Sequence, residues 1–68
     1  MTPQINHVYR VNATQHTNEI AEELQMNICN RRALVVHKWF GRLMCRINTG
    51  RGVWSQPVEL EAEDLRGE

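Results

Sequence analysis

Residues 42–48 alternate strictly between apolar side chains and longer, mostly polar ones. One set consists of Leu43, Cys45 and Ile47, and the other of Arg42, Met44, Arg46 and Asn48. A period of two residues places the two sets on opposite faces of an extended chain. The segment is therefore predicted to be a strand with one face in a hydrophobic core and the other in solvent, and it requires a sheet around it.

Turn-forming residues border this strand on both sides. Gly41 predicts either a bulge in one long strand or a tight turn between two strands. Gly50 and Gly52 can adopt positive φ, so residues 48–52 are predicted to form a hairpin connection. A phosphate-binding loop is disfavoured here, because such a loop precedes a helix and carries more glycines at set spacing.

Further strands are expected on either side of these turns. Residues 33–40 are apolar, β-branched and aromatic, which predicts a strand buried on much of both faces. Another strand is expected over residues 53–62, with Pro57 at an edge or a bulge because proline cannot donate to a ladder. Residues 64–68 are expected to fray.

The N-terminal half predicts one strand followed by one helix. Residues 5–13 alternate as a strand does, with Ile5, His7, Tyr9 and Val11 on one side. Helical spacing follows, and its apolar stripe consists of Ile20, Ala21, Leu24 and Ile28. We expect the helix to be capped by Thr17 and to end near Asn30.

These elements predict a single α+β domain over residues 1–68. A small antiparallel sheet of three to four strands would carry one amphipathic helix on one face, in the order strand, helix, strand, strand, with a further strand last. The alternative is a small SH3-like barrel formed by residues 32–62, with the helix as an N-terminal addition. No run of apolar residues is long enough to span a membrane and no secretory signal is evident, so the cytoplasm is the expected location.

Charge is balanced overall but unevenly distributed. Eight Lys and Arg residues offset eight Asp and Glu residues. Residues 24–58 nevertheless contain six cations and no acid, while the segments before and after them are net acidic. This basic middle segment indicates a charged surface and is the strongest compositional signal.

Metal binding and catalysis are disfavoured. The candidate ligands are Cys29, Cys45, His7, His16 and His37, and no two of them have the close spacing of a structural zinc site. Cys45 is expected in the core and Cys29 near a helix C-terminus, where the dipole does not favour a thiolate. Both thiols are expected to be free in the cytoplasm. We therefore expect neither a cofactor nor an enzymatic activity.

The chain is predicted instead to act by binding. The candidate contact residues are Arg42, Arg46, Arg51, Lys38, Arg31, Arg32, Trp39 and Trp54. Arginine and tryptophan are enriched at protein-binding hot spots, so a protein partner or a multi-subunit complex is the first expectation. Nucleic acid is the alternative, with Trp39 or Trp54 stacking on bases. In a third interpretation the acidic C-terminal strand pairs with the basic one and neutralises its face.

The small size of the chain and its lack of a recognisable set of catalytic residues suggest a class of protein to compare it with. In those respects the chain is similar to small enzyme-free inhibitors or adaptors encoded by phages and mobile elements, anti-CRISPR proteins among them. No residue pattern carries this similarity. No membrane contact is expected, and an exposed strand edge would also allow a homodimer.

Overall fold

The computed structural model describes residues 2–67, which form one antiparallel sheet of six strands and one α-helix. The elements in chain order are β1 (Val8–Val11), α1 (Gln15–Leu24), β2 (Arg32–Trp39), β3 (Arg42–Gly50), β4 (Val53–Trp54), β5 (Val58–Leu60), the 3-10 turn η1 (Ala62–Asp64) and β6 (Leu65–Arg66). Neighbouring strands follow the order β4-β3-β2-β1-β6, and β5 also pairs with β3. The α+β class is confirmed, but the strands are more numerous than expected and their order differs.

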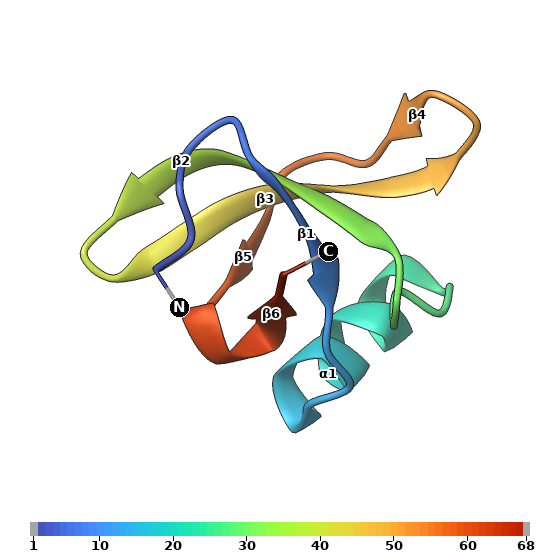
Figure 1. Cartoon of the computed structure of the whole chain (residues 1–68). Coiled ribbons are helices and arrows are strands. Elements are labelled where there is room, and N and C mark those ends of the chain that lie inside the picture. Colours follow the sequence, from blue (N-terminus) through green and yellow to red (C-terminus); the bar gives the residue numbers. More distant parts are fainter. Residues whose placement is uncertain (1, 68) are drawn as a thin grey trace.

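The hairpin of β2 and β3 forms the long arch at the top of Figure 1. Trp39 pairs with Arg42, so Phe40 and Gly41 alone make the turn. Both have positive φ, 49° and 76°, as a two-residue type I′ hairpin requires. Gly41 therefore belongs to a tight turn, and the irregularity in this ladder lies instead between Val35 and His37.

The strand expected over residues 53–62 is divided in two. β4 pairs with the end of β3, where Asn48 faces Trp54, and β5 pairs with the beginning of β3, where Leu43 faces Leu60. Residues 55–57 separate the two short strands. Pro57 lies in this break, where its missing N–H costs no ladder hydrogen bond.

The helix begins and ends earlier than its sequence pattern suggests. Thr14 is the N-cap, because its hydroxyl accepts from the Thr17 backbone N–H at 3.1 Å, while the Thr17 hydroxyl accepts from the Thr14 N–H at 2.8 Å. Thr17 is thus the third helical residue and not the cap. The helix stops at Leu24 because Gln25 adopts a left-handed conformation with φ 57°. Ile28 remains buried, but from the loop that follows the helix.

The C-terminal segment is ordered, so the expected fraying is wrong for residues 64–67. Leu65 pairs with Val11 and is 4% exposed, and Asp64 is 1% exposed. The remaining residue of that prediction, Glu68, lies outside the described residues. A barrel of residues 32–62 alone is also not formed, because β1 and β6 lie outside that range and extend the sheet beyond β2.

The core lies between the inner face of the sheet and the segments packed below it. Figure 1 shows α1 and η1 on the same side of the β2–β3 arch. The buried apolar residues are Tyr9, Val11, Ile20, Ile28, Ala33, Val35, Leu43, Cys45, Ile47, Leu60 and Leu65. The inward set of β3 is confirmed in full. Within residues 2–67, no helix has the length and the apolar character to cross a membrane.

Two predicted strand faces are only partly buried. Ile5 and His7 are exposed, so the inner face of the first strand is reduced to Tyr9 and Val11. Residues 33–40 are not buried on both faces: Ala33 and Val35 are buried, whereas the last four residues of this range are exposed. The reason is geometric, since the hairpin of β2 and β3 extends past β1 and leaves its tip uncovered.

Candidate interaction surface

Two aromatic side chains project from the tip of the β2–β3 hairpin. Trp39 is 63% exposed and Phe40 is 91% exposed. Their ring centroids lie 5.6 Å apart with the planes inclined by 35°, which is within the range of favourable aromatic pairs. Together with Met44, Arg42 and Glu59 they line a shallow hollow of about 250 Å³. We call Trp39, Phe40 and Met44 the aromatic tip.

Phe40 occupies a backbone conformation that disfavours it. At φ 49° a bulky side chain is uncommon, and the first central residue of a type I′ turn is normally Asn, Asp or Gly. The side chain gains almost no burial in return. A residue that strains the turn and contributes nothing to the core points to a contact outside the folded chain.

One of the predicted basic residues is already paired. The register that sets Met44 opposite Glu59 brings Arg42 beside the same carboxylate, and Arg42 Nη1 donates to Glu59 Oε2 at 2.7 Å. The two side chains are 60% and 46% exposed, so the pair stabilises the fold by at most about 1 kcal/mol. The acidic C-terminal strand therefore does neutralise part of the basic face, at the tip.

The other predicted cations are spread over the sheet. Arg46 points outward from the middle of β3, and its Nη1 donates to the Ser55 carbonyl at 3.3 Å. Arg51 lies in the β3–β4 turn, at the opposite end of β3 from Arg42 (Figure 1). Lys38 pairs with the inward-facing Leu43 and is thus out of phase with Arg42.

The remaining predicted contact residues lie near the start of β2 and at β4. Arg31 is half-buried, and its Nε donates to the Asn27 carbonyl at 2.8 Å. Arg32 is exposed at the first position of β2. Trp54 is half-buried and pairs with Asn48. The predicted set is therefore not one patch. Trp39 and Arg42 lie at the tip, Lys38 lies next to them on the opposite face of the hairpin, and the others lie elsewhere on the sheet.

The sequence interpretation missed Phe40 and Met44. Phe40 looked like the end of a buried strand because it closes an apolar run. A bulky residue directly before a glycine, between two strand patterns, was the available signal for an exposed hairpin turn.

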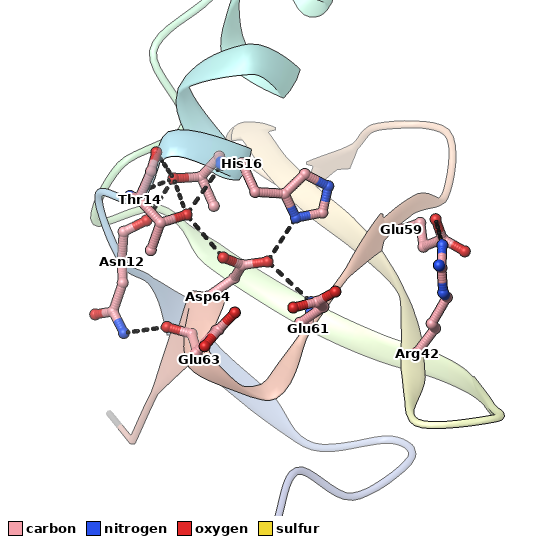
Figure 2. Close-up of polar contacts among 9 residues, drawn as sticks. Asn12, Thr14, His16, Arg42, Glu59, Glu61, Glu63 and Asp64 are labelled. Carbon is pink, nitrogen blue, oxygen red and sulfur yellow. Dashed lines mark hydrogen bonds and ion pairs between the residues drawn. The ribbon is translucent and has the colours of Figure 1, made fainter.

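A buried carboxylate ties the C-terminal segment to the start of α1 (Figure 2). Asp64 Oδ1 accepts from the Thr14 hydroxyl at 2.7 Å. Asp64 Oδ2 accepts from the Glu61 backbone N–H at 2.9 Å and is 2.8 Å from His16 Nδ1. We call these four residues the Asp64 clamp. Sequence reasoning gave no role to His16 beyond a rejected ligand and none to Asp64.

The clamp keeps its carboxylate charged. Burial raises the pKa of Asp64, but hydrogen bonds from the Glu61 backbone, the Thr14 hydroxyl and the His16 ring outweigh it, and the net pKa is lowered. The neighbouring hydroxyl of Thr17 donates to the Asn12 carbonyl at 2.7 Å. Because the nearby hydroxyls are already committed to structural bonds, the arrangement works as a brace between two chain segments.

The cysteines and histidines do not assemble into a reactive centre in the described part of the chain. Burial raises the pKa of Cys45 to about 12, so its thiol stays protonated at neutral pH. Cys29 is a free, half-buried thiol. Among residues 2–67 no three His, Cys, Asp or Glu side chains are grouped to hold a metal ion.

Comparison with protein-family models, with curated proteins and with solved structures finds no match for this chain.

Proposed function

We propose that the protein acts without catalysis, by binding a protein partner or complex as an inhibitor or adaptor, and that the aromatic tip is the contact. One observation carries this proposal: Phe40 is 91% exposed at a positive-φ turn position where a small polar residue would be unstrained. The expected location is the cytoplasm, in keeping with the free thiols of Cys29 and Cys45.

The tip has the composition of a binding hot spot. An aromatic pair surrounded by an arginine and a polar rim is the arrangement in which a few residues supply most of the binding energy. The hollow of about 250 Å³ beside Trp39, Phe40 and Met44 is large enough for one apolar side chain of the partner. The Arg42–Glu59 pair at its edge would fix the orientation of the partner through complementary charges.

The binding free energy that the tip can supply is too small to hold a partner by itself. Burying the exposed parts of the two rings removes about 250 Å² of apolar surface from water, which corresponds to about 6 kcal/mol. Association costs about 4–15 kcal/mol in lost freedom. The tip is therefore the anchor of a larger contact.

Comparative capture from the native host tests the proposal. Three baits are used in parallel: the wild-type chain, its Phe40→Asn variant and its Val53→Thr variant. Phe40→Asn places an Asn-Gly pair in the turn, which suits type I′ geometry, and removes the ring. Val53 is 56% exposed at the other hairpin, so Val53→Thr is a matched loss of exposed apolar surface.

The proposal predicts a protein that wild type and Val53→Thr retain and Phe40→Asn loses. Equal capture by all three forms would overturn the tip as the contact. Light scattering measures the molar mass in solution and so tests the alternative that the partner is a second copy of this chain. If wild type is a dimer and Phe40→Asn is a monomer, the tip joins two copies and the proposal of a different partner fails.

A further inference from the structure

We propose that the partner contact extends from the aromatic tip onto the outer face of the sheet, where it takes a segment of the partner protein that carries apolar side chains and a carboxylate. This inference rests on the proposed function, because it completes the contact that the tip begins. The surface consists of Val8, Leu34 and Arg46, and we call it the outer patch. Each residue lies on a different strand, so the patch exists only in the folded chain.

Strand register places the three residues of the outer patch in one line. Leu34 of β2 pairs with Val8 of β1 on one side and with Arg46 of β3 on the other. Directly opposed residues point to the same face, and adjacent strands lie about 4.8 Å apart. The chain neighbours of Leu34, Ala33 and Val35, are fully buried in the core. Because successive side chains of a strand alternate, the whole line points away from the core.

No helix in the described part of the chain covers the outer patch. The helical elements of residues 2–67 are α1 and η1, and both lie on the other side of the β2–β3 arch (Figure 1). Val8 and Leu34 are half-buried and Arg46 is exposed. The solvent face of an antiparallel sheet is normally polar, so two adjacent apolar side chains beside an exposed aromatic tip indicate a surface that contacts another molecule.

The outer patch is continuous with the aromatic tip. Met44 belongs to the tip and lies two residues before Arg46, so the two side chains are on the same face of β3. Arg42 lies two residues further back on that face and pairs with Trp39, whose ring therefore belongs to it as well. The contact surface thus runs along the outer side of the hairpin, from its turn to the middle of β3.

The added area matters because the tip alone is small. The patch continues the surface by about 17 Å along the strands and about 10 Å across them, which adds about 170 Å². With about 250 Å² at the tip, the contact covers about 400 Å² of this chain. That area corresponds to a small transient interface, in which the partner gains both an aromatic anchor and a fixed orientation.

Arg46 determines which partner the patch fits. Its Nη1 donates to the neutral Ser55 carbonyl at 3.3 Å, and within residues 2–67 it forms no ion pair with a carboxylate. Glu59, which faces Met44, is already bonded to Arg42 at 2.7 Å. Neither β2 nor β3 contains an acid. An exposed guanidinium group next to apolar side chains is complementary to a segment in which a carboxylate adjoins apolar residues.

Selection from a phage-displayed library of random linear peptides tests the patch with a defined probe. Wild type is the bait, and fluorescence polarisation then measures how tightly the labelled peptides bind to purified variants. The proposal predicts peptides that combine Asp or Glu with apolar residues, because such peptides match both the charge and the apolar surface of the patch. Enrichment of cationic peptides, or of no peptide at all, would overturn it.

Charge reversal separates the outer patch from the rest of the hairpin. Arg46→Glu should weaken peptide binding about tenfold or more, because it removes a charge-assisted hydrogen bond and adds repulsion. Leu34→Thr should weaken it about fivefold through lost apolar contact. The matched control, Lys38→Glu, reverses an exposed charge on the opposite face of the hairpin and should stay within about threefold of wild type. Circular dichroism establishes that each variant is folded, and Arg46→Lys should retain most of the affinity.

The outer patch and the proposed function fail in different ways. If Phe40→Asn abolishes peptide binding while Arg46→Glu and Leu34→Thr bind as wild type does, the tip stands and the patch is refuted. If Arg46→Glu loses binding and Phe40→Asn keeps it, the proposed function fails and the patch remains a binding surface. An equal loss in Lys38→Glu would make the effect one of net charge and refute the patch. Competition by an oligothymidylate at equal affinity would assign Arg46 to nucleic acid and refute a protein segment as the occupant.

Discussion

Replacing Asp64 by Asn should remove much of the stability of this domain. The amide that replaces the carboxylate keeps one acceptor oxygen and points a donor at groups that already donate. His16 is 39% exposed in its side chain and can bond to water, and the Thr14 hydroxyl lies 3.3 Å from that of Thr17. The Glu61 backbone N–H is the donor least able to find another acceptor, because it is part-buried at the start of η1.

The expected loss is about 3 kcal/mol. One charge-assisted hydrogen bond contributes about 1.5–3 kcal/mol, and a stranded buried donor costs about 1–3 kcal/mol. A domain of this size has about 3–10 kcal/mol in total. The midpoint of thermal unfolding should therefore fall by about 15 °C.

The dependence on pH gives a second, signed readout. The folded-state pKa of Asp64 is lowered, so its contribution is present above the unfolded value near about 3.9 and is lost as the pH falls through the folded value. Wild type should lose stability steeply below about pH 4, and Asp64→Asn should lose less over the same interval because it lacks this titration.

Urea unfolding followed by circular dichroism at pH 7 and at pH 3 measures both effects. Glu22→Gln is the matched control, since it removes an exposed acid of α1 that lies outside the clamp and should leave the midpoint unchanged. The reasoning is refuted if Asp64→Asn unfolds within about 0.5 kcal/mol of wild type at pH 7, because the clamp would then hold nothing together.

Two further predictions follow from burial. In the native protein an alkylating reagent at pH 8 should modify Cys29 and spare Cys45, because burial raises the pKa of the Cys45 thiol to about 12. Cys45 should react only after denaturant is added, and mass spectrometry of the peptides identifies which thiol is modified. Rapid labelling of Cys45 in the native protein would contradict its place in the core. Leu65→Ala should lower the free energy of unfolding by about 3 kcal/mol, because Leu65 is 4% exposed in β6 and its truncation leaves a cavity. An effect below about 0.5 kcal/mol in chemical denaturation would mean that the C-terminal segment is not part of the folded unit.

The sequence predicted what depends on local periodicity. The alternation of Leu43, Cys45 and Ile47 placed the core face of β3 correctly, and the hairpin of β3 and β4 was recognised from its glycines. Gly41 left a bulge and a tight turn open, and the structure has the turn. The helix end was missed because Gln25 adopts the left-handed conformation without the glycine that usually marks it. The helix propensities of the residues around Gln25 therefore do not predict that the helix ends there.

Contacts between distant segments could not be predicted from the pattern. Asp64 was assigned to a fraying tail because the last few residues of a domain are usually poorly ordered, and its partners Thr14 and His16 lie 50 and 48 residues away. Arg10 and Arg66 meet only through the register of β1 and β6.

The exposure of Trp39 could not be predicted from the sequence pattern. An apolar and aromatic run such as residues 33–40 is typical of a buried strand, and only the length of the hairpin beyond β1 uncovers its end. The predicted importance of Trp39 and Arg42 stays a prediction, now attached to a defined surface.

The free energy of unfolding of Phe40→Asn tests the central claim most directly, because it asks whether Phe40 serves folding or binding. Relief of the strained turn stabilises the variant by about 1 kcal/mol, which offsets about 0.5–1.5 kcal/mol lost from the contact with Trp39. Urea unfolding should give a value within about 0.5 kcal/mol of wild type, or higher. A loss of more than about 1.5 kcal/mol would make Phe40 a structural residue and contradict the account.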